Sequence, residues 1–212
     1  MKKSGHCFGL FLKFTNYLFT TWHKNWYNKH KKEMQLRRNL DRKDVNWLFD
    51  IGEYVSYGNN GICQVAEITN MQGADDSDRQ YYILKPINSE SGKIYTPIDN
   101  DKVYIRELIT VSEAEKLLKD IASIEIIDIV NPRELDAEYK RRIRTGNWHM
   151  WVSIIKTIFH KRDEREKNGK KLTTSDERYL REVSTRLYDE LSFVMNKEYE
   201  EVEALVSAAI YG

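Results

Sequence analysis

The chain of 212 residues is long enough for one large or two small domains. Its hydrophobic fraction of 41% and charged fraction of 32% argue against an intrinsically disordered protein and suit a folded, soluble one. The only cysteines, Cys7 and Cys63, lie far apart, which argues against a disulfide framework and a thiolate zinc site and suits a reducing cytoplasm.

The formal net charge of +1 hides a segregation of charge along the chain. Residues 1–46 contain 11 Lys/Arg and 3 Asp/Glu, whereas residues 47–111 contain 5 and 10. Residues 140–171 again contain 11 Lys/Arg and only 3 Asp/Glu. Clustered basic charge is expected of a protein that binds a polyanion such as DNA, although a solvated helix face explains the charge equally well.

We interpret residues 1–46 as a basic N-terminal extension. Its apolar run from Cys7 to Phe19 contains Lys13 and Asn16 and is shorter than the about 20 apolar residues of a membrane span. The aromatic and lysine residues that follow allow an amphipathic helix on a membrane surface or on nucleic acid. Two alternatives stay open: the extension is disordered, or Met34 is the true start and residues 1–33 are not native.

Residues 50–109 show the pattern of short strands separated by turn residues. The Gly58-Asn59-Asn60-Gly61 step predicts a tight turn, because Asn and Gly accept positive φ angles. Five short strands at this spacing favour a small twisted barrel or a sandwich over a parallel sheet. The predicted strands are Tyr54–Tyr57, Gly61–Ile68, Gln80–Pro86, Lys93–Pro97 and Val103–Ile105.

From Thr110 onward the apolar residues recur at helical spacing, which predicts a change of domain. Five features predict where helices begin or end: capping boxes at Ser112/Glu115 and Thr174/Glu177, the Asn131-Pro132 pair, and the Thr145-Gly146 and Asn168-Gly169 breaks. Asn196 is predicted to cap the last helix at its start. Together they predict a bundle of four or five helices.

The sequence contains no catalytic signature such as a phosphate-binding loop or a nucleophile elbow. His149 and His160 would lie about 16 Å apart along one helix, too far to share a metal ion. The acidic cluster at Asp75, Asp76 and Asp78 lacks the spacing of a calcium loop and reads as a solvated hairpin tip. We therefore expect a protein that is not an enzyme and uses no cofactor or metal.

Three segments of the β-rich region carry a family resemblance. Phe49-Asp50-Ile51-Gly52-Glu53-Tyr54-Val55, then Tyr82-Ile83-Leu84-Lys85, and Tyr95-Thr96-Pro97 resemble the RNA-polymerase-interacting domain of the CarD-like family of bacterial transcription regulators, also found in transcription-repair coupling factors. The resemblance continues over residues 134–210, including Tyr139-Lys140, Lys161-Arg162-Asp163 and Leu172-Thr173. It implies an α+β protein: a small Tudor-like β-barrel domain at 47–111 followed by a helical DNA-binding domain at 112–212.

The resemblance also implies a function and its partners. The β domain would bind the RNA polymerase β subunit, and the helical domain would bind promoter DNA near the upstream edge of the bubble and stabilise the open complex. We expect such a chain to be a cytoplasmic monomer without a small-molecule substrate or membrane attachment. The candidate polymerase-binding residues are Lys93, Ile94 and Tyr95, and the candidate DNA-binding residues are Leu135, Lys140, Arg141, Arg142, Lys161 and Arg162.

Two positions depart from the family pattern. Leu135 stands where several members have a tryptophan, so it is either an apolar wedge at an opened base step or a residue packed between helices. Tyr95 stands where some members have an arginine that contacts polymerase. Two other functions stay open: a protein–protein adaptor whose helical domain does not bind DNA, and a variant anchored on a membrane through residues 1–33.

Overall fold

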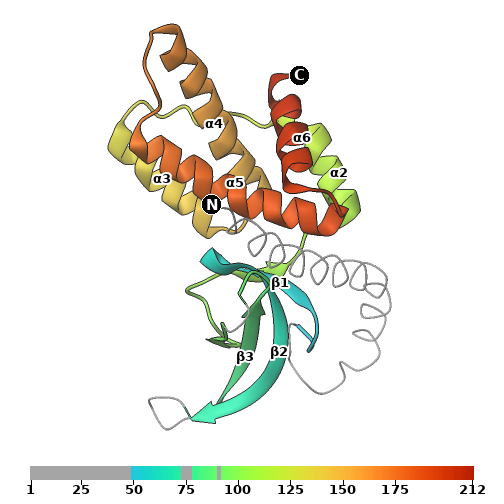
Figure 1. Ribbon diagram of the computed structural model, residues 1–212. Coiled ribbons are helices and arrows are strands. Elements are labelled where there is room, and N and C mark those ends of the chain that lie inside the picture. Colours follow the sequence, from blue (N-terminus) through green and yellow to red (C-terminus); the bar gives the residue numbers. More distant parts are fainter. Residues whose placement is uncertain (1–48, 73–77, 90–91) are drawn as a thin grey trace, which may run out of the picture. The chain divides into compact units, whose positions relative to one another are not determined.

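The computed structural model describes residues 49–72, 78–89 and 92–212 (Figure 1). Residues Ile51–Gly212 form one compact unit, in which an antiparallel sheet is followed by five α-helices. The α+β class predicted from the sequence is therefore confirmed. The predicted extension over residues 1–46, the alternative start at Met34 and the tip at Asp75 and Asp76 lie outside the described residues.

The sheet consists of five strands in the order β4-β3-β2-β1-β5, and every neighbouring pair is antiparallel. Four strands lie where the alternation of residues predicted them, although β2 and β3 are longer than expected. The strands are β1 (Tyr54–Tyr57), β2 (Gly61–Gln72), β3 (Asp78–Pro86), β4 (Ile94–Pro97) and β5 (Ile105–Glu107).

The last strand begins two residues later than predicted, at Ile105 rather than Val103. Tyr104 instead forms hydrogen bonds with the turn between β1 and β2. Its hydroxyl donates a hydrogen bond to the Gly58 carbonyl (2.8 Å), and the Gly58 N–H donates to the Tyr104 carbonyl (3.1 Å). Gly58 has a φ of 44°, and a Cβ there would lie 2.3 Å from a methyl carbon of Val103, so only glycine fits this turn.

The sheet is open, so the predicted closure into a Tudor-like barrel is not confirmed. β4 pairs only with β3 and β5 only with β1 among the described strands, and these two short strands are the opposite edges of the sheet. A barrel would need its first and last strands to pair. Here helices cover the β5 edge instead, through contacts described below. The core of the sheet is formed by the fully buried Val55, Cys63, Val65 and Leu84.

The helices are α2 (Val111–Asp120), α3 (Pro132–Arg144), α4 (Trp148–Lys167), α5 (Thr174–Met195) and α6 (Tyr199–Tyr211). The Asn131 side chain caps α3 as predicted, because its oxygen accepts the Arg133 N–H. Gly146, with a φ of 67°, makes the predicted break before α4.

Three predicted caps are wrong in position. The capping box of α2 consists of Thr110 and Glu113, two residues before the predicted pair, and α5 is capped by Thr173 rather than Thr174. Asn196 does not begin the last helix. It adopts the left-handed conformation (φ 54°) that ends α5, which asparagine tolerates better than most residues.

Helix α4 contributes several fully buried residues to the core of the bundle. Trp151, Val152, Ile154, Ile155 and Ile158 are completely buried, and they point to more than one side of the helix. Trp151 is therefore a core residue, whereas Trp148 is only partly buried. No helix within the described ranges is long and apolar enough to cross a membrane.

Candidate functional site

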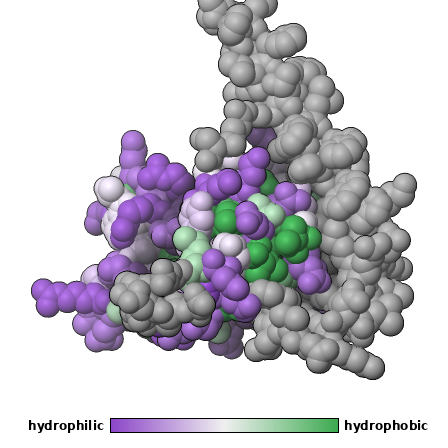
Figure 2. Space-filling view, turned by 90° about the horizontal axis from the view of Figure 1, so that it is seen from below, coloured by the Kyte–Doolittle hydropathy of each residue, from purple (hydrophilic) through white to green (hydrophobic). Residues whose placement is uncertain are grey.

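The β4 edge of the sheet carries the three residues predicted to contact a partner. Lys93 precedes the strand, and Ile94 and Tyr95 are its first two residues. The Tyr95 side chain is 51% exposed, whereas Thr96 next to it is buried. Alternation along a strand explains this contrast, since successive side chains point to opposite faces. Figure 2 shows, in a view from below, apolar side chains gathered among hydrophilic ones.

The backbone of β4 offers hydrogen-bonding groups at the open edge. The Ile98 N–H donates to the Gln80 carbonyl at 2.9 Å, which makes residues 80 and 98 a hydrogen-bonded pair. In an antiparallel ladder such pairs alternate with pairs whose amide groups point outward. The pairing of Tyr95 with Ile83 is of the second kind, so the N–H and carbonyl of Tyr95 face away from β3. Pro97 has no N–H, which limits strand addition to the part of β4 around Lys93 and Tyr95.

The opposite edge of the sheet is covered by Arg106 of β5 and its helical partners. The Arg106 guanidinium donates to both Glu190 carboxylate oxygens of α5 (2.7 and 2.8 Å), and its Nε donates to the Gly146 carbonyl at 2.6 Å. The guanidinium carbon also lies 4.5 Å from the centre of the Trp148 ring, within cation–π range. These contacts attach β5 to the helical bundle.

Glu190 is the buried acceptor at the centre of this cluster, with 1% of its surface exposed. Besides Arg106, it accepts the Ile109 N–H at 2.8 Å and the Trp148 Nε1–H at 3.1 Å. A buried carboxylate requires such partners, because removing its charge from water is costly. This cluster was not predicted from the sequence. The available signal was that Glu190 lies on the same helical stripe as Leu187 and Val194, where an apolar residue is expected.

Three of the predicted DNA-binding cations lie on α3, each with an acidic partner on the same helix. Lys140 pairs with Asp136 at 2.7 Å, and its side chain is 54% exposed. Arg141 and Arg142 both bind Glu138, but Arg142 is only 21% exposed and also donates to the Ser153 hydroxyl of α4. Exposed ion pairs such as the first are worth little in water, so Lys140 and Arg141 can exchange their partners for phosphates. Arg142 instead joins two helices.

The other two predicted cations lie on α4. Lys161 donates to the buried Asp176 of α5 at 2.8 Å, which ties it to the bundle. Arg162 lies over the Phe159 ring, 4.3 Å from its centre, and donates to the Tyr211 hydroxyl at 2.7 Å.

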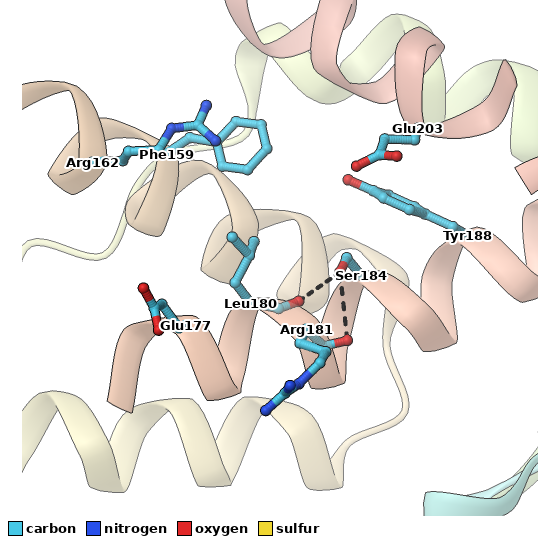
Figure 3. A pocket seen from close by; sticks show the side chains of 8 residues that line it. All are labelled: Phe159, Arg162, Glu177, Leu180, Arg181, Ser184, Tyr188 and Glu203. Atoms are coloured by element: carbon cyan, nitrogen blue, oxygen red, sulfur yellow. Dashed lines mark hydrogen bonds between the residues drawn. The ribbon is translucent and has the colours of Figure 1, made fainter. Parts of the chain in front are cut away.

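Arg162 also lines a hollow of about 320 Å³ among α4, α5 and α6. Figure 3 shows that Glu203 and the buried Tyr188 point toward each other at one side of the hollow. The lining contains the cations Arg162 and Arg181 and the anions Glu177 and Glu203, so it has no excess of charge that would favour a phosphate.

Leu135 lies on the inner face of α3. Its side chain is 7% exposed, and Tyr139 and Ile143 on the same face are also buried. In this conformation Leu135 presents almost no surface to a base step. The packed position weighed in the sequence analysis is the one the structure contains.

Charge is divided between two parts of the helical region. Residues 130–171, which include α3 and α4, contain 12 Lys/Arg and 6 Asp/Glu, whereas residues 172–212 contain 4 and 9. Lys167, Lys170 and Lys171 are exposed around the turn between α4 and α5, and no ion pair is seen for them in the described part of the chain. A polyanion would therefore meet α3, α4 and this turn with less repulsion than α5 or α6.

The described part of the sheet has an unpaired edge at β4 that can pair with another strand. Residues 49–109, which include all five described strands, match the family model of the CarD-like/TRCF RID domain. RID domains of this kind are non-enzymatic protein-interaction domains, and the match implies interaction with RNA polymerase. No curated protein matches the chain.

The resemblance found in the sequence is thus confirmed for the β-rich region. The match ends at Ile109, before the first helix. The further resemblance over residues 134–210, the division into domains at 47–111 and 112–212, and the contact residues stay predictions.

Proposed function

We propose that the chain is a bacterial transcription regulator that binds the RNA polymerase β subunit through its RID domain and promoter DNA through its helices. The observation that carries this proposal is the RID match over a sheet in which β4 has a free edge among the described strands. An open edge with an exposed aromatic side chain suits addition of a partner strand. Such a regulator acts in the cytoplasm, where polymerase is.

The proposed docking surface is the β4 edge from Lys93 to Tyr95. The outward N–H and carbonyl of Tyr95 would pair with a strand of the polymerase, and the exposed Tyr95 ring would pack against its surface. Pro97 would set one end of the docked strand, because it cannot donate a hydrogen bond.

The first test is polymerase binding by the Tyr95→Glu variant, measured as the affinity of the full chain for purified core polymerase. A carboxylate on the exposed face removes the aromatic contact and adds a charge that must be desolvated, so we expect weaker binding. The matched control is Tyr211→Glu, since Tyr211 is similarly exposed (55% against 51%) but lies on α6. Unchanged affinity of a folded Tyr95→Glu protein would remove β4 from the interface.

The proposed DNA surface is the positive side of the bundle, formed by α3, α4 and the turn after α4. Lys140 and Arg141 are the predicted cations with the most exposed side chains, 54% and 59%. Phosphate contacts by such residues give affinity that is largely independent of sequence and falls with salt, so polymerase would supply the location. Open-complex stabilisation would follow from holding the upstream DNA against the bound polymerase.

The second test measures promoter-complex half-life over several salt concentrations for Lys140→Ala and Arg162→Ala. Each lost phosphate contact should reduce the slope of log affinity against log salt by about 1. Lys119→Ala is the control, because this exposed lysine lies on α2, away from the positive side. Wild-type slopes for both variants, with polymerase binding intact, would favour the adaptor function in which the helices do not bind DNA.

A further inference from the structure

Arg106 connects the RID sheet to three separate parts of the helical bundle. Its guanidinium binds the carboxylate of Glu190 on α5, the carbonyl of Gly146 in the turn between α3 and α4, and the ring face of Trp148 on α4. Glu190 in turn accepts the N–H of Ile109, which lies between the sheet and α2. One buried ion pair therefore joins the sheet and the connection after it to α4, α5 and the turn before α4.

The surrounding residues fit this arrangement closely. Gly146 has a φ of 67°, and a Cβ on it would lie 2.7 Å from the ring of Tyr104, so the turn rests directly on the residue before β5. Two contacts that do not involve Arg106 or Glu190 also join the sheet region to the helical bundle. Arg186 of α5 donates to Asn59 at 2.9 Å, and the rings of Tyr54 and Phe193 lie 5.1 Å apart.

Arginine is the side chain that this position requires. Its planar fork donates in parallel to both oxygens of a carboxylate while its face stacks on an aromatic ring. A lysine ammonium can reach one acceptor at a time and cannot make both kinds of contact. The arrangement is directional, so it fixes an orientation as well as a distance.

We infer that Arg106 is a positioning residue that, through Glu190, makes the β4 edge and the α3–α4 surface parts of one rigid body. The consequence for transcription rests on the proposed function: polymerase bound at β4 would then hold the positive side of the bundle at a fixed place on upstream DNA. Without the ion pair, the sheet would still dock, but the helices would sample many positions and lose their hold on the DNA.

The test measures rigidity directly, without polymerase or DNA. Spin labels are attached to cysteines replacing the exposed Lys85 of β3 and Lys167 of α4, in the full chain with Cys7→Ser. Cys63 stays unlabelled, because it is fully buried and burial raises the pKa of its thiol to about 12. Pulsed electron resonance then gives the distribution of distances between the labels.

We expect one narrow peak for the wild-type residues at 106 and 190, and loss of that peak for Arg106→Met and Glu190→Gln. Glu190→Gln keeps an acceptor for Trp148 and Ile109 but presents an amide N–H₂ to the guanidinium, so it breaks the ion pair selectively. Arg142→Met is the matched control: Arg142 is as buried as Arg106 (21% and 20% exposed) and is also ion-paired, but it joins helix to helix. The distance distribution of the Arg142→Met variant should keep a narrow peak.

A narrow peak for Arg106→Met, in a protein whose circular dichroism is unchanged, would overturn the inference. If Arg106→Met does not fold, the Glu190→Gln distribution decides in the same way. A further arm adds polymerase and a promoter, where Arg106→Met should keep polymerase affinity and lose the gain in open-complex lifetime. Absence of polymerase binding by the wild type would refute the proposed function and leave the distance result valid.

Discussion

Leu135 lies four residues before the buried Tyr139 and eight before the buried Ile143, on the face of α3 that packs into the bundle. Residues at this spacing occupy one stripe of a helix, so their burial is coupled. A leucine in such a stripe stabilises the folded state, because its side chain is removed from water and packs against neighbouring side chains. A role as a base-step wedge would require it to leave this stripe.

We expect Leu135→Ala to lower the free energy of unfolding by about 2–5 kcal/mol, because it leaves a cavity beneath α3. Urea unfolding of the full chain measures this loss. Arg133→Ala is the control on the same helix, since that side chain is exposed and its replacement should change stability by no more than about 0.5 kcal/mol. Wild-type stability of Leu135→Ala combined with a shorter open-complex lifetime would favour the wedge.

At the scale of one element, Glu138 holds the C-terminal half of α3 together. Its carboxylate accepts hydrogen bonds from Arg141 and from Arg142, all at 2.7 Å. These bonds favour the charged form and lower the pKa of Glu138 from 4.5 to about 2. Arg142 extends the same group to Ser153, so the charge on Glu138 also helps to attach α3 to α4.

The lowered pKa of Glu138 predicts how stability depends on pH. A carboxyl group with a lower pKa in the folded state stabilises the fold above its unfolded pKa, and this stabilisation is lost as pH falls from about 4.5 toward 2. We therefore expect the wild type to lose more stability than Glu138→Gln over this interval. Parallel urea titrations at pH 5 and pH 3 measure the difference. Identical losses for both proteins would show that Glu138 is not responsible.

For the molecule as a whole, the buried pair of Arg106 and Glu190 is the link between sheet and helices. Because Ile51–Gly212 is one compact unit, damage at this link should affect both parts together. Buried ion pairs add little to stability over apolar packing, but loss of one partner leaves the other charge buried without compensation. The ion pair thus fixes how the sheet and the helices are oriented relative to each other more than it adds to the free energy of unfolding.

We expect Glu190→Ala to lower the free energy of unfolding by about 3–5 kcal/mol, since Arg106, Trp148 and Ile109 all lose their acceptor. Amide hydrogen exchange should rise in β5 as well as in α4. Arg181→Ala on the same helix is the control, because Arg181 is exposed and its replacement should change stability by no more than about 0.5 kcal/mol. Faster exchange confined to α5 would contradict the role of Glu190 as a link.

Much of this fold could be predicted from the sequence, because the signals for its elements are local. The turn at Gly58–Gly61, the Asn131 cap and the break at Gly146 each follow from the conformations that those residues allow. The RID resemblance was likewise contained in short segments of one domain. Errors of one or two residues at Thr110 and Thr173 arose because several Ser, Thr and Glu residues near each helix start form equally good local patterns.

Only the tertiary structure decided which residues separated along the chain meet. Arg106 and Glu190 are 84 residues apart, and nothing local to either one specifies the other. The same holds for Lys161 with Asp176, which lie on different helices. The charge pattern of the sequence could suggest candidate binding residues. Packing determined which of these cations are paired with buried carboxylates, because a buried charge is stable only beside an opposite charge.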